Sequence, residues 1–239
     1  MLDRTRGAGW RSTARAFAAL IVCAAASAPA RADDALETKQ LVEKAKLTFD
    51  TFVADPQMKP MHDLLKRAKG VFVAPQVIRG AFVVGASGGS GVFVAKDSAS
   101  GKWSSPAFYT IGDVSFGLQA GGDASEVVLV ALSDRGVSAL LSDSLKLGAD
   151  VGMAVGPVGA GAEASTAGLS ADIVSYSRSK GAYAGISLEG SLVKTKPGWN
   201  KAFYGQEVTP TDILIKGTAT NPAAEPLVSA IAKASSATN

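Results

Sequence analysis

The chain has one cysteine and one histidine in 239 residues, and this scarcity excludes several classes of protein. Cys23 stands alone, so neither an intrachain disulfide nor a cysteine zinc site can form. His62 is the only imidazole, and the aspartates are spread singly, mostly beside glycine or serine, as turn and cap residues are. General acid–base or metal chemistry has little to use here. We therefore predict that the protein is not an enzyme and needs no cofactor or metal.

Charge is also sparse, at 19% of the residues. Four arginines precede the apolar run Ala16–Ala28, which is too short to span a bilayer, and Ala30-Arg31-Ala32 is a small-x-small cleavage site. This order is typical of a secretory signal peptide, which we place at residues 1–32, and it predicts a periplasmic protein secreted across the inner membrane. A second interpretation stays open, in which Cys23 carries a lipid anchor. It is weaker because the bulky Val22 stands where a small residue is expected.

The leader also explains the basic character of the whole chain. It holds five arginines and one aspartate; without it 19 basic and 20 acidic residues remain, and the net charge changes from +3 to −1. We therefore expect no nucleic-acid partner, and any anion must bind at a local patch. We predict such a patch, with an anionic lipid or membrane surface as its partner, at Lys59, Lys66, Arg67, Lys69 and Arg79.

Hydrophobic periodicity predicts helices at residues 36–53 and 61–68, a capped helix from Ser133 to Leu141, a short one over 212–216, and a weak one over 221–233. Residues 197–204 suggest a loop with one helical turn. Strands are expected from Val71, over Glu126–Leu132, and at residues 173–176, 183–188 and 191–194. Residues 147–156 alternate bulky and bare side chains, which predicts a strand in a curved sheet.

Glycine dominates one stretch, Gly80–Gly122. Two short aliphatic runs, ending at Val84 and starting at Val92, flank the cluster Gly85–Gly91, which predicts paired strands joined by a tight bend. On this basis we expect Gly88→Val or Gly91→Val to cost about 2 kcal/mol or more. The predicted fold class is α+β, with N-terminal helices packed on a strongly bent, glycine-rich, mostly antiparallel sheet that approaches a barrel. We expect one domain over 33–239, with its core at about 36–216 and a weakly ordered C-terminal helix and tail.

Two local motifs and a set of aromatic residues suggest more specific functions. Gly85-Ala86-Ser87-Gly88-Gly89 matches the nucleophile elbow literally, but a strand instead of a helix follows it and His62 precedes the serine. Gly159–Ala164 resembles a dinucleotide fingerprint outside any βαβ unit, so we interpret it as a bend. Aromatic residues present a third hypothesis, an envelope protein that binds a protein or glycan partner without lipid specificity, through Trp103, Phe108, Tyr109 and Trp199.

A series of short motifs in order resembles the SYLF domain family over about residues 36–216. They are Ala68–Val71, Gly85–Phe93, Trp103–Phe108, Gly117–Gly121, Gly156–Gly159, Tyr176–Gly181, Gly185–Gly190, Phe203–Gly205 and Asp212–Leu214. The resemblance implies a non-enzymatic module, because eukaryotic SYLF proteins bind phosphoinositides and membranes and some associate with actin. With its leader, this chain resembles a secreted bacterial member. One departure is that eukaryotic lipid binding involves a basic amphipathic N-terminal helix, whereas residues 36–53 carry mixed charge.

Overall fold

The computed structural model describes residues 30–81, 84–116, 121–156, 170–179, 182–183 and 188–237. Its helices are α1 (Ala30–Ala54), η1 (Pro56–Met58), α2 (Lys59–Arg67), α3 (Asp134–Leu140), α5 (Pro197–Tyr204), α6 (Pro210–Leu214), η2 (Pro222–Ala224) and α7 (Glu225–Ser236). Its strands are β1 (Gly70–Ala81), β2 (Val84–Ala95), β3 (Ala107–Phe116), β4 (Gly121–Ala131), β5 (Ser144–Lys146), β6 (Met153–Val155), β7 (Ile173–Ser179), β8 (Ala182–Tyr183) and β9 (Leu192–Thr195). The predicted leader lies outside the described residues, except that α1 begins with Ala30–Ala32.

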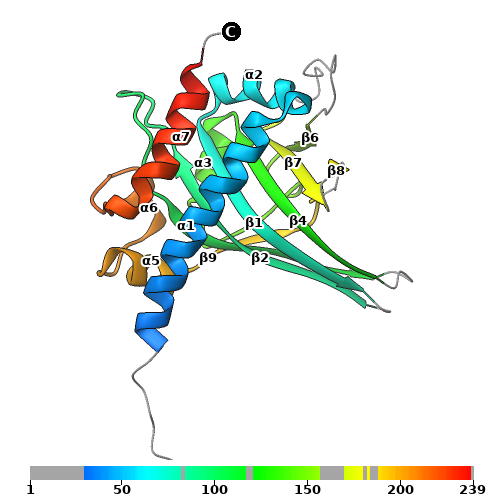
Figure 1. The fold of residues 1–239 in the computed structure, drawn as a ribbon, viewed down its shortest axis with the longest axis horizontal. Helices are drawn as coiled ribbons and strands as arrows, with labels where there is room; N and C mark the ends of the chain where they lie inside the picture. Colours follow the sequence, from blue (N-terminus) through cyan, green and yellow to red (C-terminus); the bar gives the residue numbers. More distant parts are fainter. Residues whose placement is uncertain are drawn as a thin grey trace, which may run out of the picture.

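The strands form one strongly curved sheet in the order β5-β9-β3-β2-β1-β4-β7-β6, with β8 paired to β7. Every pairing is antiparallel except that of β6 with β7. Helix α1 crosses one face diagonally, with α7 beside it and α2 across its C-terminal end (Figure 1). The predicted fold class is confirmed.

Alternation along the strands divides the core between the two faces of the sheet. On β1, Val71 and Val73 join the cluster under α1, whereas Phe72 and Ala74 join the cluster on the other face, which α3 and α6 cover. Helix α1 buries one stripe at helical spacing, as predicted: Thr38, Leu41, Val42, Ala45, Thr48, Phe49 and Phe52. On β4, all side chains from Val127 to Ala131 are buried, which confirms a strand covered on both faces.

The prediction of a bend at Gly85–Gly91 is wrong. Strand β2 runs unbroken from Val84 to Ala95 and pairs on both sides, with β1 and with β3. At Gly89 the glycine has another cause. A Cβ on Gly89 would lie 2.2 Å from the carbonyl oxygen of Gln76, next to a register shift in β1, and none of the described glycines of β2 has a positive φ. Close approach of neighbouring backbones therefore requires the glycine, and turn geometry does not.

The predicted strand at residues 147–156 is only partly formed. Leu147 and Val151 make an isolated bridge around a turn in which Gly148 has φ +80°, and only Met153–Val155 forms a strand. The alternating pattern was produced by two short segments separated by this turn. Residues 197–204 form a helix of eight residues, with Pro197 at its first turn, where the prediction was a loop with one helical turn. Gly159–Ala164 lies outside the described residues.

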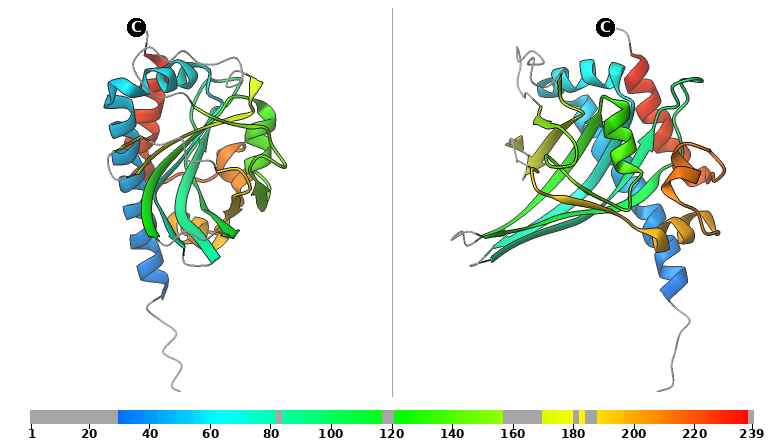
Figure 2. Two further views of the ribbon diagram at one scale, coloured as in Figure 1. Left: turned by 90° about the vertical axis from the view of Figure 1, so that its right-hand side faces the viewer. Right: turned by 180° about the vertical axis from the view of Figure 1, so that it is seen from behind.

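The middle four strands extend well beyond the helices. Residues 76–81, 84–90, 110–116 and 121–125 form a curved, four-stranded projection, which we call the arm (Figures 1 and 2). Helix α1 diverges from the arm, so one face of the arm is not covered by that helix. The α2 end and the arm lie at opposite ends of the central strands.

Candidate binding surface at the α2 end

Helix α2 is positioned by its buried side. Met61, Leu64 and Leu65 pack into the core under α1, and Asp55 caps the preceding 3₁₀ turn by accepting the Gln57 N–H at 2.8 Å. The opposite side exposes Lys59, Asp63 and Arg67, which are four residues apart and therefore form one stripe. Within the described residues, Lys59 and Arg67 make no ion pair.

Two further predicted cations lie beside this stripe, each with an acidic partner. The Lys66 ammonium is 3.1 Å from the Asp63 carboxylate, and the Lys69 ammonium is 2.6 Å from that of Asp134. Both pairs are well exposed to solvent, so each contributes about 0.2–1 kcal/mol to stability and leaves its lysine available to compete for another anion.

Lys96 joins the surface, and the sequence analysis missed it. The Lys96 N–H donates a 2.8 Å hydrogen bond to the Lys69 carbonyl, because antiparallel pairing places the end of β2 beside the start of β1. Its ammonium lies 5.9 Å from the centre of the Trp103 ring. Lys96 is far from the other cations in sequence, so only the register of β1 with β2 could have indicated its position. We call Lys59, Lys66, Arg67, Lys69 and Lys96 the α2 cluster.

Arg79 does not lie with the other four predicted cations. It is ten residues beyond Lys69 along β1, a distance of about 30 Å for an extended strand. Its cross-strand neighbours are Ser87 on β2 and Asp123 on β4, both on the arm. The structure therefore brings four of the five predicted lipid-binding residues together and places the fifth at the other end of the sheet.

His62, the single histidine of the chain, does not lie on the exposed stripe of α2. The residue is half-buried on α2, and its buried Nε2 has no hydrogen-bond partner among the residues that the structure describes. The exposed positions of α2 lie on the Lys59 stripe, so helix packing turns the imidazole towards the protein.

The hypothetical nucleophile Ser87 is not at an elbow. It lies within β2, and its hydroxyl donates a 3.0 Å hydrogen bond to the Asp113 carboxylate while it accepts the Asp113 N–H at 3.1 Å. His62 belongs to α2, at the other end of the sheet. The strand–turn–helix geometry that the motif requires is absent at this serine.

The aromatic hypothesis loses its basis, because Phe108 and Tyr109 are fully buried and Trp103 and Trp199 are half-buried. The Tyr109 hydroxyl donates a 2.6 Å hydrogen bond to the Leu140 carbonyl, and burial raises its pKa above its usual value. These side chains build the core and offer no exposed aromatic cluster.

The described residues contain no cluster of three or more histidine, cysteine or acidic side chains able to hold a metal ion. No helix in the same ranges combines the length and apolar character needed to cross a bilayer.

Comparison with known proteins identifies the family. A family profile described as "Ysc84: Las17-binding protein actin regulator" matches residues 112–234. The chain belongs to the Ysc84, or SYLF, family. The human SH3 domain-containing YSC84-like protein 1 is 37% identical over 170 residues, which cover 70% of this chain and 49% of the human protein. YSC84 of Saccharomyces cerevisiae is 35% identical over 182 residues, and LAS seventeen-binding protein 3 of the same species is 33% identical over 180 residues. In both cases the matched residues cover 74% of this chain and 38% of the yeast protein. This SYLF chain thus spans about half the length, or less, of these relatives.

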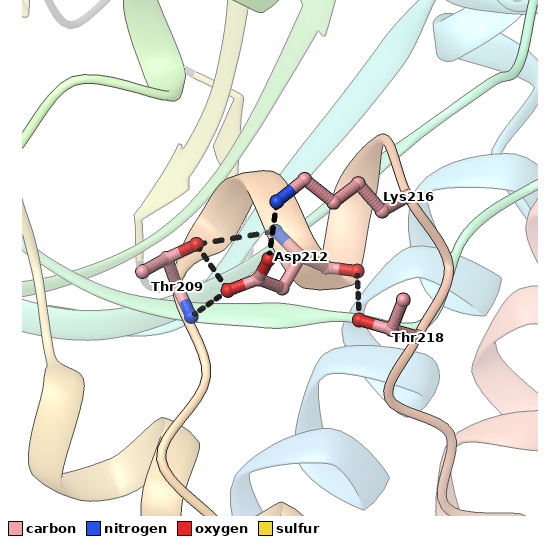
Figure 3. A network of polar contacts seen from close by, with 4 residues as sticks. All are labelled: Thr209, Asp212, Lys216 and Thr218. Carbon is pink, nitrogen blue, oxygen red and sulfur yellow. Dashed lines mark hydrogen bonds and ion pairs between the residues drawn. The ribbon is translucent and has the colours of Figure 1, made fainter.

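Several SYLF motif residues serve the fold. Figure 3 shows Asp212 at the start of α6, where it accepts hydrogen bonds from Thr209 and contacts Lys216 at 2.9 Å. The Thr209 hydrogen bonds, with a further contribution from Lys216, lower the pKa of the Asp212 carboxyl far below its usual value. Thr218 donates to the backbone carbonyl of Asp212, which ties the following loop to this helix. In the same way, the Tyr204 hydroxyl donates to the Pro106 carbonyl at 2.6 Å.

Proposed function

We propose that this SYLF chain is a non-catalytic module of the cell envelope that docks on an anionic lipid surface through the α2 cluster. The observation that carries the proposal is the convergence of five cations at one end of the sheet, where Lys59 and Arg67 are exposed and make no ion pair among the described residues. The predicted leader supports an exported location. The lipid binding that the SYLF resemblance implies supports the ligand class.

Charge sets the scale of this interaction. The five cations are offset by Asp63 and Asp134, which leaves three positive charges in excess. Each lysine or arginine near an anionic membrane contributes about 1 kcal/mol, so the α2 cluster would raise affinity by about 3 kcal/mol, on the order of a hundredfold. This attraction falls off over a Debye length of about 10 Å at 0.1 M salt, so binding should weaken sharply as salt is added.

The test is vesicle co-sedimentation of the chain from Asp33 onward, so that the arginines of the leader do not contribute. The double variant Lys59→Glu/Arg67→Glu should lose most binding to phosphatidylglycerol vesicles. The matched control is Lys39→Glu/Lys146→Glu, which reverses two exposed cations, unpaired in the described ranges, on α1 and β5. Equal binding of the original protein to anionic and to neutral phosphatidylcholine vesicles at low salt would reject the proposal, as would equal losses in the two double variants.

A second candidate function is binding of a protein partner without lipid specificity. It is favoured by the family description, "Las17-binding protein actin regulator", and by a relative named for binding LAS seventeen. Those names describe relatives of which this chain spans only part. We therefore propose that the chain binds a protein, without naming that protein. If the chain does not bind vesicles but does bind a purified protein partner, this second function is favoured.

A further inference from the structure

Large aliphatic side chains are exposed on the arm and on the two elements beside it, α1 and β9. Gln76 lines a cavity with α1, and Ile78 is two residues further along β1, so Ile78 points to the same face; its side chain is 57% exposed. Leu192 on β9 is 51% exposed, and Leu47 on α1 is 61% exposed and lines the same cavity as Gln76. Singly exposed aliphatic residues are normal on a protein surface, so what matters is how these three lie relative to one another.

Cross-strand register places these residues in one row. Ile78 pairs with Gly88, Gly88 with Gly112, and Gly112 with Leu192, while Ala124 pairs with Ile78 from the other side. Residues directly opposite each other on paired strands point to the same face. The row is therefore a trough with two bulky sides, Ile78 and Leu192, and a bare floor of two glycines. A Cβ added at Gly88 would meet no atom of the described residues within 4 Å, so this part of the floor is open among them.

The dimensions of the trough match an α-helix. Three strand spacings separate β1 from β9, which is about 14 Å, and an α-helix with its side chains is about 10–12 Å across. Along β2 the floor continues from the exposed Ala86 to the half-buried Ser90, where it ends because the Lys196 ammonium donates a 3.3 Å hydrogen bond to the Ser90 hydroxyl. This length is about 13 Å, or between two and three helical turns. A single acyl chain is much thinner and would leave most of this width unfilled.

Helix α1 forms the third side. Lys44, Leu47 and Thr51 face Pro75, Gln76 and Ala124 across a cavity of about 360 Å³. Glu126 also lines this cavity, but its carboxylate is held by an ion pair with Arg178. In contrast, Lys44 on α1 and Lys194 on β9 are exposed and make no ion pair among the described residues. Lys196 lies at the Ser90 end of the floor, and its ammonium interacts electrostatically with Glu37 and Asp34 on α1. Three lysines against these two carboxylates leave a net charge of +1 for the groups named here around the groove.

We propose that the groove between α1 and the arm, bounded by Leu47, Ile78 and Leu192 and floored by Gly88 and Gly112, binds an amphipathic α-helix of a protein partner. The apolar side of that helix lies in the trough, and acidic residues on its flanks pair with Lys44 and Lys194. Charge complementarity and the helix-sized width select this occupant over a lipid chain. The groove is separate from the α2 cluster, so the two surfaces can be occupied together.

Two synthetic peptides test the proposal on the full chain. Both are three-turn to four-turn alanine-based helices with leucines at i, i+4, i+7 and i+11; one has glutamates on its flanks and the other has lysines. Fluorescence anisotropy should show the acidic peptide binding at least tenfold more tightly than the basic one at low salt. The proposal is overturned if neither peptide binds below about 1 mM, or if both bind equally.

Gly88→Leu is the decisive variant, because it fills the floor without a clash. Gly88 has no positive φ, and no atom of the described part of the chain lies within 4 Å of its Cβ position, so the variant should fold. It should weaken the binding of the acidic peptide at least tenfold. Gly198→Leu on α5 is the matched control, since it adds the same side chain at an equally open, exposed glycine elsewhere and should leave binding unchanged. Binding that survives Gly88→Leu would overturn the proposal.

Two other occupants would also give distinct results. If the groove instead holds a second copy of the chain, sedimentation equilibrium will show a dimer that Gly88→Leu dissociates. If it holds lipid, Gly88→Leu but not Gly198→Leu will reduce binding to neutral phosphatidylcholine vesicles. Either result overturns the choice of a partner helix, and neither depends on whether the α2 cluster binds anionic vesicles.

Discussion

Adjacent glycines on β2 should respond oppositely to the same substitution. Gly88 and Gly89 are both in extended backbone, but their Cβ positions point to opposite faces of the sheet. At Gly88 that position is open, whereas at Gly89 it lies 2.2 Å from the Gln76 carbonyl oxygen and 3.0 Å from the Val77 Cα. A methyl group at Gly89 must therefore displace the backbone of β1 by about 1 Å where that strand already shifts register.

The two magnitudes follow from these distances. Gly89→Ala should lower the free energy of unfolding by about 2–3 kcal/mol, because the displaced strand is paired on both sides and cannot move alone. Gly88→Ala should raise it by about 0.4–1 kcal/mol, because it removes conformational freedom from the unfolded chain at no steric cost. Guanidinium melts followed by far-ultraviolet circular dichroism measure both values.

If alanine lowers the free energy of unfolding equally at the two positions, the close-approach argument is refuted. If alanine raises it equally at both, β1 accommodates the methyl group. The result also bears on the expectation that valine at Gly88 or at Gly91 costs about 2 kcal/mol or more. The structure limits that expectation to Gly91, whose Cβ would lie 2.4 Å from the buried Phe72 ring and 2.8 Å from the Val73 carbonyl oxygen.

Two further predictions concern buried and exposed polar groups. Asn200→Leu should lower the free energy of unfolding by about 2 kcal/mol in a denaturant melt, because the fully buried Asn200 Oδ1 accepts the Phe108 N–H at 2.9 Å and no other acceptor would replace it; an unchanged melt would contradict this. The depressed pKa of Asp212 means that its stabilisation is complete above the unfolded value of about 3.9 and is lost as the pH falls below it. Asp212→Asn should therefore reduce stability at pH 7 and flatten the loss of stability below pH 4, and parallel pH profiles for the two proteins would exclude this role.

Much of the secondary structure could be predicted because local patterns determine it. The buried stripe of α1 repeats at helical spacing, and Ser133 and Thr209 cap α3 and α6, with Ser133 accepting the Gly136 N–H and Thr209 the Asp212 N–H. The apolar run through Val127–Ala131 is the strand with both faces covered. Helix α7 was expected from Leu227 and Ile231, both fully buried, although it continues to Ser236, beyond the predicted end.

The candidate surface was only partly predictable. Lys59, Lys66, Arg67 and Lys69 are close in sequence and stay close on and after α2, because a helix advances only about 1.5 Å per residue. Arg79 is ten residues from Lys69, as Lys59 is, but the strand between Lys69 and Arg79 advances about 3.3 Å per residue. Arg79 therefore lies on the arm. Lys96 reaches the α2 cluster only because β2 returns antiparallel to β1.

Composition and periodicity by themselves determined that this chain is an α+β protein with a glycine-rich, mostly antiparallel sheet, and its ordered motifs were sufficient to indicate the SYLF family. Those features follow from patterns of residue type that can be followed along the chain. Only the tertiary structure decided why Gly89 and Gly91 of β2 must be glycines and where the cations and exposed aliphatic residues lie. Gly89 is required by a carbonyl on β1, and the groove joins Leu47, Ile78 and Leu192 from α1, β1 and β9. Strand register and the crossing of α1 over the sheet set these contacts between distant segments, and no local pattern encodes them.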